Sequence, residues 1–384
     1  MKSTLVYLFI VIVTVGGCKK NETPPTPPTI TSFEPQQLSP NNYVIIHGSH
    51  FDSVAANNVV TFNGLPATIF KLEGDSAIIA NVPENVTAGK ITVTANGVTV
   101  TTANAYTVLA GGWIRKADLP APNNGLINDI GFAIGNTGYM GLGTDNGAAC
   151  NTLYAYDPSA DRWTAKSPIP VGLESPFYMV VNGKAYVGTG DTRHNGYSKL
   201  LFEYNPLTDT WTAKANFPDR RRGLSAFAVG DKGYAGFGTD TSFHSMTDWW
   251  QYNPATDTWT RKADFPKAYG PYEGSGFAVN DKIYIALSEE LWQYDPALDS
   301  WTKKNRPPLD RLVMKGVVID NKGYLMGLAN WLYDDATDTW TQKAMFKPRL
   351  GGAGFSIGNK GYYGTGRGWP SDFLNLDFWE YTPE

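Results

Sequence analysis

The stretch Tyr252-Asn-Pro-Ala-Thr-Asp-Thr-Trp259 decides the fold, because variants of it recur through most of the 384-residue chain. Its last residue opens a Trp-(Thr/Ile)-x-Lys motif that occurs six times, 39 to 50 residues apart, at Trp113, Trp163, Trp211, Trp259, Trp301 and Trp340. A Tyr lies seven residues before five of these positions, at Tyr156, Tyr204, Tyr252, Tyr294 and Tyr333. Self-similarity at such a period indicates a repeat protein in which each repeat is one supersecondary unit.

Each repeat predicts four short strands. The first strand (a) is apolar, as in Ala226–Val229, and the second (b) carries a Tyr, as in Gly233-Tyr234. The third strand (c) carries an aromatic-x-Tyr pattern, and the fourth (d) starts at the Trp. Four strands in 40 to 50 residues are typical of a β-propeller blade. The repeats resemble Kelch repeats in strand b with its Gly-rich end, such as Gly141-Leu-Gly143, followed by Tyr-Asp-Pro and then Trp.

Strand counting predicts a ring of six blades that is closed by the two ends of the propeller, residues 110–384. Residues Phe378–Tyr381 supply a sixth strand c with no Trp after it, whereas Trp113 starts a strand d with no strand c before it. We therefore expect these two strands to pair, which would leave no open sheet edge. The alternative, an open solenoid, would need capping repeats at its ends.

Residues 30–109 predict a separate all-β domain. Short runs with period-2 alternation at Tyr43–Ile46, Val59–Phe62 and Lys90–Thr94 favour an immunoglobulin-like β-sandwich. The stretches Ile30–Pro35 and Ile46–Phe51 resemble an IPT/TIG domain. That resemblance implies an interaction or spacer module rather than a catalytic domain.

The first 29 residues predict export and anchoring. The apolar run Leu5–Val15 is too short to span a bilayer, so residues 1–17 fit a signal peptide. Val15-Gly16-Gly17-Cys18 resembles a bacterial lipobox, which implies a lipid on Cys18, and residues 18–29 form a Pro-rich linker. The expected partner is a membrane, and the expected location is the outer membrane of a Gram-negative bacterium or its cell surface. The alternative is an ordinary signal peptide with a chance Cys.

Composition narrows the function classes. A net charge of −4 disfavours a nucleic-acid partner, and 42% hydrophobic with 18% charged residues excludes a disordered chain. With Cys18 lipidated, Cys150 has no intramolecular partner, and we expect it to be an inert loop or packing residue. No metalloprotease, serine-hydrolase, phosphate-binding or EF-hand motif is present. We expect no cofactor, and we interpret His194 and His244 as solvated loop residues rather than metal ligands.

Arginine placement provides the best chemical clue to a site. Most of the 11 Arg residues fall in the b–c and d–a loops, which share one face of a propeller. The predicted ligand-binding residues on this face are Arg193, Arg221, Arg222, Glu273, Arg311 and Arg349. Arginine forks suit carboxylate, sulfate or phosphate groups. Arg221, Arg311 and Arg349 also occupy equivalent repeat positions, so a structural role in bonding loop carbonyls remains equally open.

Two function classes follow from these features. The favoured one is a non-enzymatic, membrane-anchored binding protein whose loop face meets a glycan, including an acidic one, or a protein partner. The alternative is an enzyme that resembles the Kelch sialate mutarotases (N-acetylneuraminate epimerases). That resemblance implies an Arg-lined pocket for the sugar carboxylate, with Glu174 or Glu273 as the acid/base. No acid/base pair is identifiable by spacing, and a fold does not fix a function.

Overall fold

The structure is a computed structural model, and it describes residues 26–383 except 122–124, 146, 272–273, 288–289, 309–313, 328, 346–348 and 369–372. Three residues singled out from the sequence, Cys18, Glu273 and Arg311, lie outside the described residues. The described part is all-β, as predicted, with one short 3₁₀ segment, η1 (Ala55–Asn57). It contains no helix of the length and apolar character that a membrane crossing requires.

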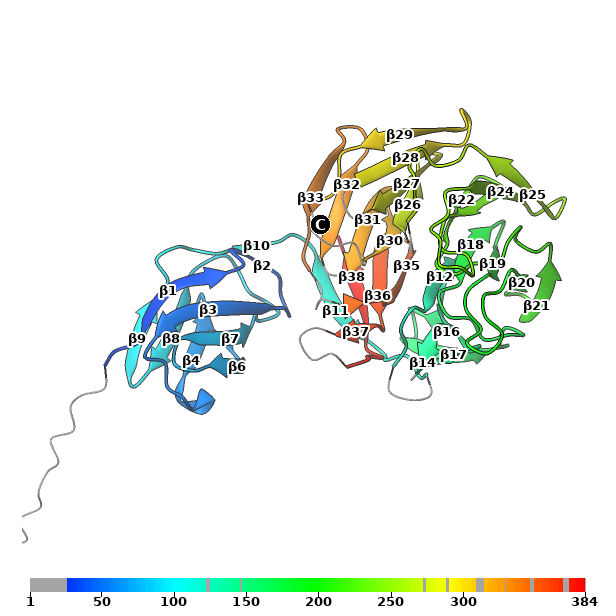
Figure 1. The fold of residues 1–384 in the computed structure, drawn as a ribbon. Coiled ribbons are helices and arrows are strands. Elements are labelled where there is room, and N and C mark those ends of the chain that lie inside the picture. Colours follow the sequence, from blue (N-terminus) through cyan, green and yellow to red (C-terminus); the bar gives the residue numbers. More distant parts are fainter. Residues whose placement is uncertain are drawn as a thin grey trace, which may run out of the picture.

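The N-terminal domain is a sandwich of two antiparallel sheets (Figure 1). One sheet has the order β1 (Thr29–Glu34), β3 (Tyr43–Ser49), β7 (Ala77–Asn81), β6 (Ile69–Glu73), and the other has β5 (Leu65–Ala67), β4 (Val59–Phe62), β8 (Ile91–Ala95), β9 (Val98–Thr101). The short strands β2 (Gln37–Leu38) and β10 (Thr107–Val108) pair in parallel. Alternate residues of both sheets, such as Ile46, Phe62 and Val93, are fully buried between them. The predicted period-2 runs therefore form the two faces of one core.

The C-terminal domain consists of six four-stranded sheets around a ring (Figure 1). We number the sheets along the chain as blades 1 to 6. Blade 1 consists of β12 (Ile130–Ile134), β13 (Thr137–Gly141), β16 (Leu153–Asp157) and β17 (Arg162–Lys166). Blade 2 consists of β18 (Phe177–Val181), β19 (Lys184–Gly188), β20 (Leu201–Asn205) and β21 (Thr210–Lys214). Blade 3 consists of β22 (Ser225–Val229), β23 (Lys232–Gly236), β24 (Trp249–Asn253) and β25 (Thr258–Lys262). Blades 4 and 5 are β26 (Ser275–Val279), β27 (Lys282–Leu287), β28 (Glu290–Asp295), β29 (Ser300–Lys304); and β30 (Met314–Ile319), β31 (Lys322–Gly327), β32 (Asn330–Asp334), β33 (Thr339–Gln342).

Blade 6 joins the two ends of the propeller. It contains β35 (Ala353–Ile357), β36 (Lys360–Gly364), β38 (Phe378–Thr382) and, as its outer strand, β11 (Gly112–Lys116). The register pairs Trp113 with Tyr381, which confirms the predicted pairing of the strand at Trp113 with the last strand c. Short extra ladders lie in the loops, β14 (Thr144–Asp145) with β15 (Ala148–Ala149) and β34 (Arg349–Leu350) with β37 (Arg367–Gly368).

The repeated Trp and Tyr residues explain how one blade holds the next. Each Trp of strand d donates its indole N–H to a backbone carbonyl of the preceding blade, as Trp211 does to Ser167 O at 2.8 Å. In blade 2, the buried Tyr204 hydroxyl donates to Asp209, and the same carboxylate oxygen accepts the N–H of Ser167. One short hairpin thus satisfies both backbone groups of Ser167, which lies in the neighbouring blade.

The sandwich contacts the propeller at its closing blade. The Met345 backbone N–H donates to the Ser39 hydroxyl at 2.7 Å, and Leu109, which follows the sandwich, packs in one cluster with Trp113 and Tyr381. A cavity of about 310 Å³ lies between the two domains, lined by sandwich residues and by Trp379 of β38. The N-terminal domain is therefore attached to the strands that close the ring (Figure 1).

The six strands nearest the axis surround a central channel of about 380 Å³. At one equivalent position of these strands, five blades carry Gly or Ala and blade 2 carries Tyr178; the small residues are Gly131, Ala226, Gly276, Gly316 and Gly354. A Cβ added to Gly316 would lie only 1.6 Å from the Gly276 carbonyl oxygen. Close approach of neighbouring inner strands therefore requires glycine there.

Candidate functional site

The loop face predicted from the sequence holds two Arg–carboxylate pairs on neighbouring loops of blades 2 and 3. The Arg193 guanidinium pairs with Glu174, and Arg222 Nη1 lies 3.5 Å from Asp191 Oδ2. The two acidic residues are themselves bridged, because each backbone N–H donates to the other's carbonyl at 2.9 Å. The structure therefore brings Arg193 and Arg222, two predicted site residues, to one side of the loop face.

Aromatic rings lie beside these arginines. The Arg222 guanidinium lies 5.8 Å from the centre of the Tyr197 ring, and Tyr197 packs edge-on against Phe243. Phe243 is 77% exposed, and the Arg193 side chain is 38% exposed. We call Glu174, Asp191, Arg193, Tyr197, Arg222 and Phe243 the blade 2–3 rim. The exposed Arg193 fork, the partly buried Arg222 fork (22% exposed) and the exposed Phe243 ring on one loop face are suited to contacts with a polar ligand.

Arg221 is placed differently from its neighbour Arg222. It is 1% exposed, and its guanidinium makes a two-pronged ion pair with Asp248 that includes an Nη2–Oδ2 hydrogen bond of 2.8 Å. The Trp250 indole N–H donates to the same carboxylate at 2.6 Å. Burial alone would raise the pKa of Asp248, but the hydrogen bonds from Arg221 and Trp250 hold that pKa below its ordinary value.

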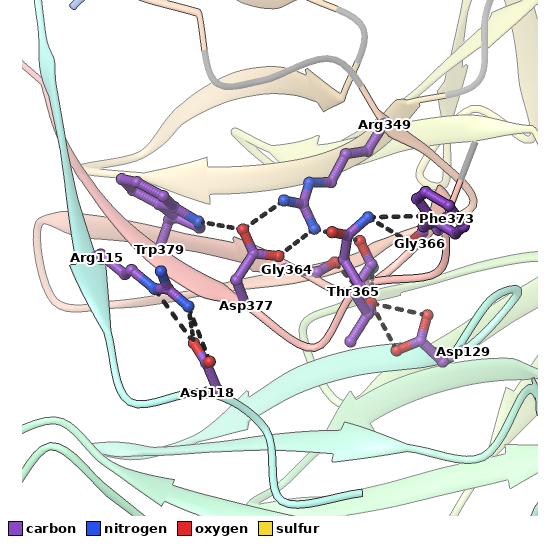
Figure 2. Close-up of polar contacts among 12 residues, drawn as sticks. Arg115, Asp118, Asp129, Arg349, Gly364, Thr365, Gly366, Phe373, Asp377 and Trp379 are labelled. Carbon is purple, nitrogen blue, oxygen red and sulfur yellow. Dashed lines mark hydrogen bonds and ion pairs between the residues drawn. The ribbon is translucent and has the colours of Figure 1, made fainter. Parts of the chain in front are cut away.

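Arg349 repeats this arrangement in blade 6 (Figure 2). It is 3% exposed and pairs with Asp377, which also accepts the Trp379 indole N–H at 2.9 Å. Arg349 Nη1 donates to the Thr365 carbonyl at 3.1 Å, as Arg221 Nη1 approaches the equivalent carbonyl of Phe237 at 3.5 Å. The two arginines are thus bound to loop carbonyls and buried carboxylates, the structural alternative that the sequence left open.

A second polar feature lies on the axis of the ring, at the loop-face end of the channel. This cavity, of about 70 Å³, is lined by residues just before or at the start of five inner strands, including Asn128, Asp129, Ser175, Ser225, Ser275 and Lys315. Asn128 donates its side-chain N–H to Glu174 at 3.1 Å, so the cavity adjoins the blade 2–3 rim. The Ser175 hydroxyl is buried, and none of the described residues forms a hydrogen bond with it.

Asp129 is the buried acid of this axial cavity. It is 1% exposed, and the Thr365 hydroxyl of blade 6 contacts both of its carboxyl oxygens, at 2.9 and 3.1 Å (Figure 2). Burial raises the pKa of Asp129 to about 7, although the Thr365 hydrogen bond and the positive charge of Lys315 both act to lower it. The side chain can therefore change its protonation state near neutral pH.

Sequence reasoning missed Asp129 and Lys315, and one signal could have found the lysine. Aligned by strand register, Lys315 occupies the inner-strand position that holds Ile130, Phe177, Ser225, Ser275 and Ala353 in the other blades. A lone charge among apolar or small residues is conspicuous once the repeats are superposed. Asp129 lies in an irregular loop, so its place in the cavity depends on the folded ring.

Residues considered for metal or thiol chemistry form no centre within the part of the chain that is described. No group of three or more His, Cys, Asp or Glu side chains there is placed to hold a metal ion. His244 Nδ1 lies 3.2 Å from Asp240, as a pair at the surface. Cys150 is half-buried against the core shared by blades 1 and 6, and burial raises the pKa of its thiol. It therefore packs as a small apolar residue.

The folds define an IPT/TIG domain followed by a β-propeller. Residues 28–108 match the IPT/TIG domain family, which confirms the N-terminal prediction. The structure described as "Structure of YjhT" aligns with a TM-score of 0.58 at 15% sequence identity, over 68% of this chain and 95% of that chain. A "protein of unknown function from Bacteroides thetaiotaomicron VPI-5482" aligns over 94% of this chain and 99% of its own, with 14% identity and a TM-score of 0.49. No curated protein sequence matches.

Proposed function

We propose that the protein is a membrane-anchored binding protein that presents the loop face of its propeller to a glycan, with acidic glycans preferred. The observation that carries this proposal is the blade 2–3 rim, which brings Arg193 and Arg222 to one loop face with Tyr197, against which Arg222 packs, and with the exposed Phe243. Rings pack on the C–H faces of sugars, while arginine forks bind carboxylates and hydroxyls. Arg221 and Arg349 support the same face from beneath, because their guanidiniums fix loop carbonyls.

The direct test is a glycan array that includes acidic sugars, probed with the full-length protein and with an Arg193→Ala/Arg222→Ala variant. We expect the variant to bind about 10- to 100-fold more weakly, since each arginine offers charged hydrogen bonds. Arg162→Ala is the matched control, because Arg162 is exposed at the end of a c–d hairpin, on the opposite face. A protein that binds no glycan, or a rim variant that binds as well as the control, would reject the proposal.

The anchor is part of the proposal and rests on the lipobox resemblance at Cys18. Cys18→Ser should move the protein from the membrane fraction into the soluble exported fraction, which fractionation of cells measures. Protease treatment of intact cells then distinguishes a cell-surface position from an inward-facing one. Unchanged membrane association of the variant would contradict a lipid anchor.

A second candidate function, a sugar mutarotase, is favoured by Asp129 alone. A carboxyl whose pKa is about 7 can both accept and donate a proton near neutral pH, as acid–base catalysis of ring opening requires. The resemblance to Kelch sialate mutarotases makes N-acetylneuraminate the substrate to test. Mutarotation followed by NMR, compared for the wild type and Asp129→Asn, decides between the functions: acceleration lost in the variant supports the enzyme, and no acceleration by the wild type leaves binding.

A further inference from the structure

We propose that the axial cavity is a subsite for a single carboxylate group of the ligand, held by the Lys315 ammonium and the Ser175 hydroxyl. This inference rests on the proposed function, since it names the part of an acidic glycan that enters the channel mouth. The cavity lies directly beside the blade 2–3 rim, to which Asn128 connects it through Glu174. A ligand that lies on the rim can therefore place one group on the axis of the ring.

Lys315 supplies a positive charge that the described residues do not neutralise. It lines the cavity from β30, and within the described part of the chain it makes no ion pair. Lys315 is half-buried. A half-buried cation without a counter-ion favours an anionic ligand at its side. Ser175 is 4% exposed and has no hydrogen-bond partner among the residues that the structure describes, so its hydroxyl can donate to the same group.

Asp129 leaves this charge uncompensated as long as it is the neutral acid. Among the described residues, its hydrogen-bond donors are the Thr365 hydroxyl and its own backbone N–H, and burial outweighs both. The titratable and charged groups that act on it or feel its charge are Lys315, Tyr178, Tyr363 and Cys150. Burial, with a smaller effect of Asp129, raises the pKa of Tyr178 to about 12, so that phenol stays neutral.

The cavity adjoins the central channel on the axis of the ring. The two share Tyr178 of blade 2 and the small residues Ala226, Gly276 and Gly316 of blades 3 to 5. Tyr178 is the one large side chain at a position where the other five blades carry Gly or Ala. A carboxylate held by Lys315 and Ser175 would therefore lie on the axis, where it can be the acidic substituent of a larger ligand.

The test uses acetate, which offers the carboxylate alone, and N-acetylneuraminate as probes of the full-length protein in NMR titrations from pH 5.5 to 8.5. We expect both probes to bind the wild type at pH 6. Their affinity for Lys315→Met should be lower by about 10-fold or more. Lys322→Met, which removes an exposed lysine on the next strand of the same blade, should bind as the wild type does. Affinity of the wild type should fall above pH 7, when Asp129 ionises and pairs with Lys315, whereas Asp129→Asn should lose this pH dependence.

Each contrary outcome has a separate meaning. If neither probe binds the wild type, or if Lys315→Met binds acetate as tightly as Lys322→Met does, the carboxylate subsite is rejected, whatever the glycan array shows. If acetate binds with the expected dependence on Lys315 and the array finds no glycan, the subsite stands and the proposed glycan function fails. An Asp129→Asn variant that keeps the fall above pH 7 rejects the role of Asp129.

Discussion

We call the contact between two neighbouring blades a seam. At five seams a carboxylate accepts a backbone N–H of the neighbouring blade, whereas at the seam between blades 5 and 6 a backbone carbonyl does so. In the five, an Asp in the c–d hairpin accepts a backbone N–H from the preceding blade; the acceptors are Asp161, Asp209, Asp257, Asp299 and Asp338. At the closing seam the corresponding residue is Gly111, and the Ala344 N–H donates instead to the Ala110 carbonyl at 2.7 Å.

The difference follows from chain connectivity. In blades 1 to 5, strands c and d are joined by a hairpin, and its Asp also accepts the hydroxyl of a buried Tyr, such as Tyr204 at 2.7 Å. In blade 6 strand d comes from the other end of the propeller, so the hairpin is replaced by the segment that leaves the N-terminal sandwich. A Cβ at Gly111 would lie 2.4 Å from the Tyr381 hydroxyl, which explains why no Asp occupies this position. The seam contact is kept, but by a different chemical group.

The largest effect is expected from removing the strand that closes the ring. Deleting residues 376–384 removes β38, which lies between β11 and β36 in blade 6. Two sheet edges and the apolar sides of adjacent blades would be exposed, so we expect aggregation or loss of cooperative unfolding. Thermal melting and size-exclusion chromatography measure this, with deletion of residues 383–384 as the control. A truncated protein that melts like the full-length chain would show that the other five blades suffice.

The buried Arg–Asp–Trp groups allow blade 3 to be compared with blade 6. Arg221→Met leaves the buried Asp248 carboxylate without its cation, and Arg349→Met does the same to the partly buried Asp377. Removing one partner of such a pair costs about 3–5 kcal/mol of unfolding free energy. We expect the larger loss for Arg349, because its partner Asp377 directly precedes the closing strand β38. Urea unfolding measures both losses. Arg261→Met, which removes an exposed ion pair with Asp264, should cost less than about 1 kcal/mol.

Ligand affinity, measured on the same two variants beside their stability, tests the ligand role that the sequence also allowed for these two arginines. Stability losses with unchanged ligand affinity of the folded fraction would assign Arg221 and Arg349 to structure alone. Weakened binding by a folded, stable variant would restore them to the site. Equal losses for Arg261→Met and Arg349→Met would contradict the importance of the buried pair.

The sequence predicted what is periodic and missed what depends on tertiary pairing. The Trp and Tyr spacings were sufficient for the blades and for the pairing of Trp113 with Tyr381, since both follow from counting strands. The equivalence of Arg221 and Arg349 was also readable. Their partners Asp248 and Asp377 each lie directly before a strand c, but a spacing does not show which side chain a carboxylate faces in the folded blade. Buried or exposed, an arginine has the same sequence signature, so only the folded loops distinguish Arg221 from Arg222.

A smaller effect is expected when a regular seam is given the residue of the closing seam. Asp209→Gly removes the acceptor of the Tyr204 hydroxyl and the Ser167 N–H, and we expect a loss of about 2 kcal/mol in unfolding free energy. Glycine tolerates the positive φ of 53° at this position, so backbone strain does not contribute. Asp320→Gly is the matched control, an Asp with φ of 49° in an a–b turn. Equal losses in the two variants would mean that the carboxylate contributes nothing to the seam.

The smallest expected effect is the pH dependence of the stability that the Asp209 charge contributes. Burial alone would raise the pKa of Asp209, but hydrogen bonds from Tyr204 and the Ser167 N–H, with the charge of Lys166, hold that pKa below its ordinary value. The unfolded chain therefore binds the proton more tightly, so this stabilisation is present above the unfolded pKa and is lost as pH falls through the folded pKa. Asp209→Asn can still accept both hydrogen bonds but cannot ionise.

We expect Asp209→Asn to be less stable than the wild type at pH 7 by less than about 1 kcal/mol, and the difference to shrink as pH falls below about 4. Urea unfolding at pH values from 3 to 7 measures it. Asp129 has the opposite sign, because its raised pKa lowers stability as pH rises toward about 7, but it is common to both proteins and cancels in the difference. A difference that stays constant from pH 3 to 7 would show that the seam uses the Asp209 oxygen without using its charge, as the closing seam uses the Ala110 carbonyl.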